Sequence, residues 1–140
     1  MSGEKQGETR KHRVVIADDE PHVRVFLRFA MNNMGLEVAG EAGNGQEALE
    51  VYRKLKPDIL LLDLNMPVKT GEEALKDVLA EFPDAVVIML SSSADRESVE
   101  ACAAIGATHY IRKDCPFEEM RAIHYETLGL PPQPEGNAAS

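Results

Sequence analysis

The stretch that decides the fold is residues 58–67, which read Asp58-Ile59-Leu60-Leu61-Leu62-Asp63-Leu64-Asn65-Met66-Pro67. Four apolar residues run without interruption into the carboxylate of Asp63. Such a run is typical of a strand buried on both faces, in a parallel sheet that helices cover. Open α/β sheets bind ligands at the carboxyl ends of their strands, so Asp63 is a candidate functional residue. Taken alone, it is equally compatible with a helix cap or a hydrogen-bonded loop carboxylate.

Four further segments have the pattern of strands. Two are continuous apolar runs like the first, at residues 14–17 and 86–90. The other two, at residues 36–40 and 109–112, mix apolar with polar side chains. Mixed strands keep one flank partly in water, which is typical of the edge of a sheet. The three apolar strands should therefore be central and the two mixed strands should be edges.

Helices are predicted between and after these strands, because apolar residues recur there with the helical period and glycine or proline marks the ends. The last helix, residues 116–128, has the weakest apolar period. The expected inner faces of the other four are Val23, Phe26, Leu27, Ala30, Met31 and Met34; Ala48, Val51, Tyr52 and Leu55; Leu75, Val78, Leu79 and Phe82; and Val99, Cys102, Ala103 and Gly106.

The alternation of five strands with five helices predicts an α/β fold of three layers, in which a parallel sheet lies between helices. Edge positions for the mixed strands give the order 2-1-3-4-5 of the flavodoxin-like doubly wound (βα)5 fold. A chain of 140 residues favours one domain. We expect it to span residues 12–128, between a disordered lead-in at 1–11 and a disordered, Pro-rich tail at 129–140.

Composition excludes several classes of function. A net charge of −9 argues against binding to a nucleic acid backbone. No apolar stretch approaches the roughly 20 residues that span a bilayer, so no membrane role is expected. The polar amino terminus is not a signal peptide. Cys102 and Cys115 have no partner at metal-ligand spacing. We predict a cytoplasmic protein with reduced thiols.

Polar side chains follow four of the predicted strands. Asp18 and Asp19 come after the first strand, Asp63 after the third, Ser91 after the fourth and Lys113 after the fifth. Each could be only a helix cap or a surface charge. However, the carboxyl ends of parallel strands share one edge of the sheet, so these side chains should converge, and their convergence needs a common reason.

Chemistry supplies that reason. Three clustered carboxylates repel one another unless a cation neutralises them, and Mg²⁺ prefers such oxygen ligands. A lysine and a hydroxyl beside the ion suit a phosphoryl group, whose oxygens such groups bind. One of the carboxylates can then act as the nucleophile. The sequence therefore predicts a Mg²⁺-dependent phosphoryl site.

With Gly71 and the segment from Leu62 to Pro67, these residues resemble the receiver domain of two-component response regulators, in the single-domain form of the chemotaxis regulators. The resemblance covers roughly residues 12–128. It implies that Asp63 accepts a phosphoryl group from a sensor histidine kinase or phosphotransfer protein. It also implies a signalling switch rather than a metabolic enzyme, although the domain would catalyse its own phosphorylation and dephosphorylation.

The resemblance assigns a role to each matching position. Mg²⁺ would be ligated by Asp19, Asp63 and the backbone carbonyl of Asn65, with Asp18 helping through ordered water. Ser91 and Lys113 would bind the phosphoryl oxygens, Ser92 and the aromatic Tyr110 would belong to the switch, and Asn65 and Ser93 would tune the loss of phosphate.

We predict an output surface built from residues 95–106, Tyr110 and residues 116–128, because the charge that phosphorylation adds to Asp63 would draw the Ser91 hydroxyl inward and make room beside Tyr110. It would bind a downstream protein partner, with the chain a monomer or a phosphorylation-dependent homodimer.

One position departs from the family pattern: Lys113 precedes Asp114, where the family usually has a proline. Asp114 could weaken the positive field of the lysine.

Three other interpretations remain. Residues 43–48 match the glycine fingerprint of dinucleotide sites, but this fingerprint normally follows the first strand. A haloacid-type phosphatase needs a second acid two residues after its nucleophile, where this chain has Asn65. A degenerate receiver would be an interaction module independent of phosphorylation, and the Asp114 departure keeps this alternative open.

Overall fold

The structure, a computed structural model, describes residues 11–92 and 95–131. Its elements are β1 (Arg13–Ala17), α2 (Pro21–Asn33), β2 (Glu37–Ala42), α3 (Gly45–Leu55), β3 (Ile59–Asp63), α4 (Gly71–Glu81), β4 (Val87–Ser91), α5 (Arg96–Ile105), β5 (His109–Arg112) and α6 (Phe117–Leu128). All pairings are parallel, in the order β2-β1-β3-β4-β5. The predicted fold class and strand order are confirmed. Most of the two segments predicted as disordered, residues 1–10 and 132–140, lies outside the described residues.

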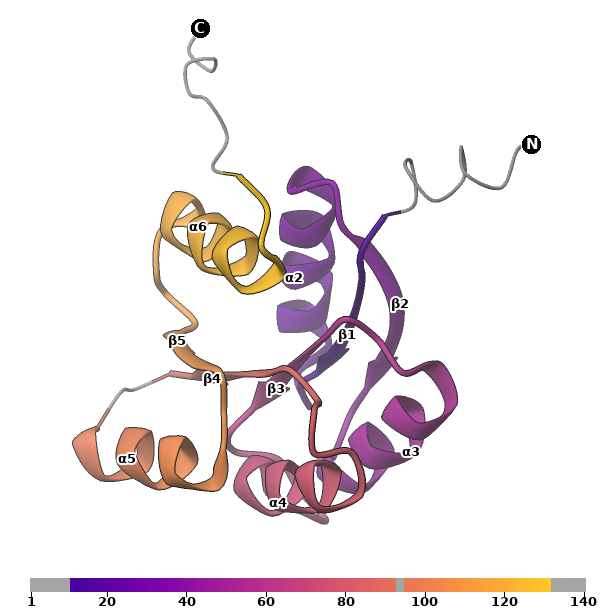
Figure 1. Ribbon diagram of the computed structural model, residues 1–140, viewed down its shortest axis with the longest axis vertical. Coiled ribbons are helices and arrows are strands. Elements are labelled where there is room, and N and C mark those ends of the chain that lie inside the picture. The colour runs from indigo at the N-terminus through magenta and orange to yellow at the C-terminus, as the bar shows by residue number, and fades with distance from the viewer. Residues whose placement is uncertain (1–10, 93–94, 132–140) are drawn as a thin grey trace, which may run out of the picture.

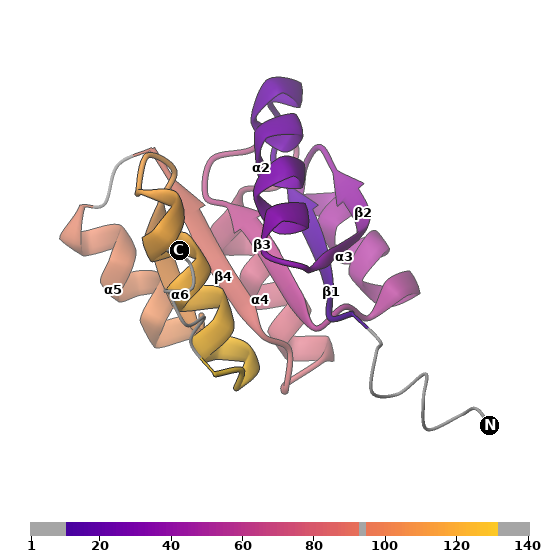
Figure 2. The same cartoon turned by 90° about the horizontal axis from the view of Figure 1, so that it is seen from above.

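The helices form two layers around the sheet. Figure 1 shows α2 and α6 on one side of the strands and α3, α4 and α5 on the other. From above, α2 and α6 lie side by side in front of the sheet (Figure 2). The two outer helices are joined where the Tyr125 hydroxyl donates to the Met34 carbonyl at 2.8 Å. The sheet is therefore covered on both faces, as its apolar strands require.

Alternating side chains of each strand supply the two halves of the core. In β1, Val14 and Ile16 face α2 and α6, whereas Val15 and Ala17 face α3, α4 and α5. Every residue of β3 and β4 is buried, and most of β2 is only half-buried. Burial of each large apolar side chain contributes about 1.5–3 kcal/mol. The central strands therefore hold the sheet together, and the carboxylate at the end of β3 starts from a rigid strand.

A capping box fixes the start of α4, directly after the loop that follows β3. The Glu73 amide donates to the Thr70 hydroxyl at 3.1 Å, and the Thr70 amide donates to the Glu73 carboxylate at 2.9 Å. Two backbone amides at the start of the helix, which have no hydrogen-bond partner within it, are paired in this way. Both ends of the loop at residues 64–70 are consequently held by regular structure.

Three predicted inner-face residues are wrong. Phe26 is 52% exposed, and Ala103 and Gly106 are also exposed. α2 contacts the sheet through a narrower stripe, which includes Leu27 and Met31. Phe26 lies one residue before this stripe, a turn of about 100° around the helix axis. Of the predicted positions in α5, only Cys102 is fully buried, since the helix lies at the edge of its layer.

β2 is longer than predicted and ends at Ala42 rather than Gly40. Its pairing with β1 continues through an irregularity between Val14 and Val15, so Ala17 still opposes Ala42. Backbone pairing can extend a strand past the apolar pattern that reveals it in the sequence.

Among the described helices none could cross a bilayer.

Candidate functional site

Strand register places two of the predicted residues beside each other. Ala17 of β1 pairs with Leu62 of β3, so the next residues along, Asp18 and Asp63, are neighbours at the carboxyl edge of the sheet. Both are buried, Asp18 completely and Asp63 with 3% of its surface exposed. Buried carboxylates are rare unless they are paired or bind a cation.

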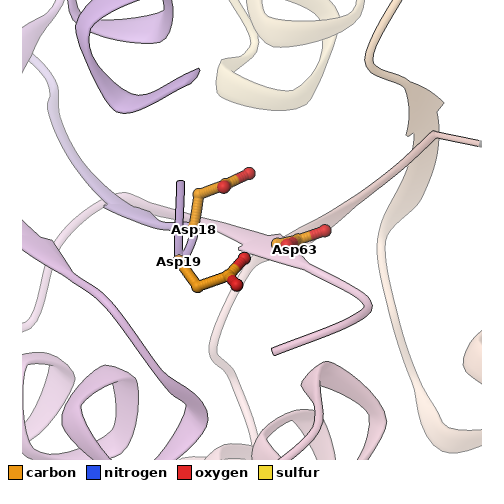
Figure 3. Close-up of side chains that lie close together, drawn as sticks. All are labelled: Asp18, Asp19 and Asp63. Carbon is orange, nitrogen blue, oxygen red and sulfur yellow. The ribbon is translucent and has the colours of Figure 1, made fainter. Parts of the chain in front are cut away.

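Asp19 completes a cluster of three carboxylates. One oxygen from each of Asp18, Asp19 and Asp63 lies within 4.8 Å of the others. Figure 3 shows the three side chains leaving the ends of β1 and β3 for the same space. Asp19 is exposed, so the cluster opens to solvent on its side. Hard oxygen ligands in this number, at an open site, fit Mg²⁺, which keeps several waters.

Lys113 supplies positive charge to this cluster. Its Nζ lies 2.8 Å from Asp18 Oδ2 and 3.3 Å from Asp63 Oδ1, with Glu20 farther away at 3.8 Å. The backbone holds it there, because the Lys113 amide donates to the Ser91 carbonyl at 2.8 Å. Sequence reasoning anticipated this convergence from strand ends that are 50 residues apart in the chain (residues 63 and 113).

The cluster still has too little positive charge. Burial and the neighbouring charge of Asp18 raise the pKa of Asp63 to about 6, although Lys113 and the Asn65 amide oppose the change. Burial lowers the pKa of Lys113, but the hydrogen bond to Asp18 and the charge of Asp63 outweigh it, so the pKa is raised overall. A single ammonium therefore does not balance three carboxylates, and a further cation is favoured at this pocket.

The loop that follows Asp63 closes tightly onto the strand. The Gly71 amide donates to the Leu64 carbonyl at 2.8 Å. A Cβ on Gly71 would lie only 2.1 Å from the Asp63 carbonyl oxygen. No side chain fits there, which explains the glycine of the motif. Asn65, whose carbonyl is the predicted metal ligand, lies within this loop with an exposed side chain.

Arg24 is a residue of this site that the sequence did not reveal. Its Nη1 donates to the Asp18 carbonyl at 2.6 Å, and its Nε pairs with Glu41 at 3.2 Å. It therefore holds the end of β1 against α2 and β2. The contact depends on the packing of three elements, and no spacing in the sequence carries a signal for it.

Asp114, which stands where the family usually has a proline, pairs with a neighbouring arginine. Asp114 forms two hydrogen bonds of 2.9 Å with the Arg112 guanidinium, and this partner lowers its pKa. The peptide bond between Lys113 and Asp114 is trans, as are all the peptide bonds that the structure describes. Lys113 itself pairs with the cluster instead. The expected weakening of the lysine by Asp114 is thus offset by Arg112.

Of the remaining predicted residues, Ser91 and Ser92 follow this edge of the sheet and Tyr110 lies within β5. Ser91, the last residue of β4, is buried, and Ser92 is exposed. Tyr110 in β5 is half-buried and packs on the core cluster under α5. Ser93 lies outside the described residues.

The glycine fingerprint at residues 43–48 has a structural explanation. It follows β2 rather than β1, and it opens α3. Where a dinucleotide would need room, the backbone of Lys69 lies against Gly45. The dinucleotide interpretation is therefore wrong.

Comparisons with known proteins agree with this geometry. The chain matches the model of the response regulator receiver domain over residues 14–124. It is 39% identical over 111 residues to the chemotaxis protein CheY of Thermotoga maritima, covering 79% of this chain and 91% of that protein. It is 42% identical over 116 residues to an uncharacterized transcriptional regulatory protein, YhcZ of Bacillus subtilis, covering 80% of this chain but 54% of that protein.

Solved structures agree as well. The chemotaxis protein CheY4 of Vibrio cholerae superposes with a TM-score of 0.77 at 28% identity, covering 84% of this chain and 98% of that one. A chain from the CheX–CheY–BeF3–Mg complex of Borrelia burgdorferi gives 0.81 at 25% identity, with 84% and 89% covered. With this fold, its acidic pocket and a family match over most of its length, the chain belongs to the response regulator receiver domain family, whose members are phosphoacceptor signalling switches of two-component systems.

Proposed function

We propose that residues 12–128 form a receiver whose Asp63 accepts a phosphoryl group from a sensor histidine kinase or a phosphotransfer protein. One observation carries the proposal: three carboxylates converge within 4.8 Å, with the Lys113 ammonium 3.3 Å from Asp63. A nucleophilic carboxylate, a cation pocket and a fixed ammonium are the parts that phosphoryl transfer needs.

The donor is a phosphohistidine, whose P–N bond is broken in the transfer. A carboxylate oxygen of Asp63 attacks the phosphorus of a phosphohistidine. The O–P bond forms while the P–N bond breaks, and the electron pair of that bond stays on the imidazole, which takes up a proton. The buried position of Asp63 favours attack because little water solvates its carboxylate.

The residues that would hold Mg²⁺ are Asp18, Asp19, Asp63 and the backbone carbonyl of Asn65. When bound, the ion neutralises the carboxylates and polarises a phosphoryl oxygen. The convergence of three carboxylates supports this assignment, because a site with excess negative charge favours a divalent cation over an empty pocket.

Lys113 and Ser91 would bind the incoming phosphoryl oxygens. Lys113 exchanges part of its pairing with Asp18 for the new charge, and Ser91 donates its hydroxyl from the neighbouring strand. Asn65 and Ser93 would tune the rate at which water removes the phosphate. A degenerate receiver is not favoured, since the carboxylates and the lysine of the phosphorylation site are present and paired in one pocket.

The metal requirement tests the proposal. With a small phosphodonor such as acetyl phosphate, the protein should gain one phosphoryl group in Mg²⁺ and essentially none in excess chelator. Intact mass spectrometry, followed by borohydride trapping of the acyl phosphate, locates the label. Equal labelling with and without the metal would contradict the proposed role of the ion.

The proposed output surface consists of residues 95–106, Tyr110 and residues 116–128. Phosphorylation replaces the single charge of Asp63 with about −1.5 to −2 and adds strong acceptors. Drawing the Ser91 hydroxyl inward would shift the connection to α5 and leave room for the half-buried Tyr110 ring. A tyrosine that packs in either of two positions provides a two-state element.

NMR measures this change directly. Addition of beryllofluoride with Mg²⁺, as a stand-in for the phosphoryl group, should move the amide signals of Tyr110, α5 and α6 as well as those of the acidic pocket. Signals of the C-terminal end of α3, at Leu55, serve as the internal control, because Leu55 contacts Arg13 at the start of β1, at the opposite edge of the sheet from the pocket. Shifts confined to the pocket would rule out this surface as the output.

A further inference from the structure

Gly45, the first residue of α3, is in unusually close contact with the loop that follows Asp63. It is buried, and a Cβ built on it would lie 2.1 Å from the Lys69 carbonyl oxygen, 2.7 Å from its carbonyl carbon and 2.8 Å from its Cβ. Backbone atoms cannot turn aside as a flexible side chain can. A side chain at position 45 would therefore have to displace the loop.

The loop is pressed onto Gly45 by its own conformation. Val68 has a φ of +67°, and the Lys69 amide donates to the Pro67 carbonyl at 2.6 Å, so the chain reverses direction within three residues. A β-branched residue rarely adopts this conformation, and it persists where the surroundings impose it. Beyond the turn, the Lys69 ammonium forms an ion pair with Asp77 of α4. Lys69 is thus held between α3 and α4, which are neighbours in Figure 1.

The start of α3 is itself firmly fixed. The Asn44 side chain caps the helix by accepting from the Glu47 amide at 2.8 Å, and the Glu47 carboxylate accepts from the Gly43 amide at 2.8 Å. Immediately before, the Ala42 carbonyl accepts from the Asp18 amide at 3.0 Å. One short turn therefore contacts both halves of the acidic pocket: the end of β1 and the loop after β3.

We infer that Gly45 is a positioning residue of the phosphoryl site. Its bare Cα lets the Lys69 backbone close down, and this contact sets where the loop holds the Asn65 carbonyl, the proposed backbone ligand of Mg²⁺. The inference rests on the proposed function and adds a residue that touches neither metal nor phosphate. It also explains the glycine in the segment Asn44-Gly45 without any bound nucleotide.

Gly45→Ala tests this inference, and Gly43→Ala is its matched control two residues away. A Cβ on Gly43 would meet its nearest atoms at an ordinary 3.6 Å. The Mg²⁺ concentration at half-maximal labelling should rise about tenfold in Gly45→Ala, as when residues behind a metal ligand are changed. At saturating Mg²⁺ the labelling rate should return toward that of the wild type, and Gly43→Ala should match the wild type throughout.

A merely structural role for Gly45 gives a different result. In that case Gly45→Ala would melt at a lower temperature with an unchanged Mg²⁺ half-saturation, and the inference would be overturned. Should Gly45→Ala not fold, Asp77→Asn loosens Lys69 from the α4 side and should raise the half-saturation by a smaller factor; an unchanged value would again contradict the inference. The wild type distinguishes a failure of this inference from a failure of the proposed function. If the wild-type protein takes no label on Asp63, the proposed function itself is contradicted.

Discussion

Asp63→Asn should abolish labelling by acetyl phosphate while leaving the protein folded. The amide has nearly the shape of the carboxylate, so it fits the same buried position at the end of β3, but it lacks the nucleophilic oxygen anion. Intact mass spectrometry in saturating Mg²⁺ measures the label. Asp84→Asn, which changes an exposed aspartate, should be labelled like the wild type. Label retained in Asp63→Asn would mean that another residue is the acceptor.

The same substitution should change stability in a pH-dependent way. The pKa of Asp63 lies at about 6 in the folded state, against 3.8 for an ordinary aspartate. Between these values the folded protein holds a proton that the unfolded chain has released, so wild-type stability falls as the pH rises through this window and levels off above it. Without metal at pH 7, Asp63→Asn should be more stable than the wild type by about 3 kcal/mol, because each unit of the raised pKa corresponds to about 1.4 kcal/mol.

Denaturant unfolding at several pH values, in chelator, measures this difference. The two proteins should have similar stability below pH 3.8 and diverge up to about pH 6. Addition of Mg²⁺ should stabilise the wild type and leave Asp63→Asn little changed, since a ligand stabilises only the state that binds it. A difference that does not vary with pH would show that the charge of Asp63 is not its cause.

Lys113→Ala should have the second large effect. The substitution leaves the carboxylates of Asp18 and Asp63 without the ammonium that lies 2.8 Å and 3.3 Å from them. Loss of one partner of a buried pair costs about 3–5 kcal/mol; because Lys113 is partly exposed, we expect about 2–3 kcal/mol in the absence of metal. The unfolding free energy of a domain is only about 5–15 kcal/mol, so the loss is substantial.

Mg²⁺ should recover much of this stability. A pocket without its ammonium is more negative, so the stabilisation per added Mg²⁺ should be larger in Lys113→Ala than in the wild type. The phosphorylated variant should nevertheless fail to shift the output surface, because the ammonium that would bind the phosphoryl oxygens from the β5 side is missing. Lys76→Ala, which changes an exposed lysine on α4, is the control. If Mg²⁺ stabilised Lys113→Ala and Lys76→Ala by the same amount, Lys113 would be an ordinary surface charge.

The strands and the edge at which the site forms could be predicted from the residue pattern. Uninterrupted apolar runs such as Ile59–Leu62 stay out of water only as central strands of a covered sheet. In a parallel sheet, the residue after each strand then has to lie at the common carboxyl edge. For this reason Asp18, Asp63 and Lys113 could be assigned to one pocket before any distance was known.

The balance of charge among those residues depends on distances that only the folded protein sets. The raised pKa of Asp63 depends on its burial and on the distances to Asp18 and Lys113. The pairing of Asp114 with Arg112, rather than with the neighbouring lysine, depends on side-chain direction in β5. Neither quantity follows from periodicity, because periodicity reports which face is apolar and carries no information on charge separation.

Packing between elements decided the rest. Phe26 has the helical spacing of a core residue, yet it is exposed because the contact between α2 and the sheet is narrower than the apolar stripe. Gly45 resembles part of a nucleotide motif until Lys69, 24 residues away by number, is found against it. A sequence pattern reports what each element prefers locally. Contacts such as these are set by the close packing of elements on one another, where a single extra carbon determines whether the loop of the phosphoryl site can close.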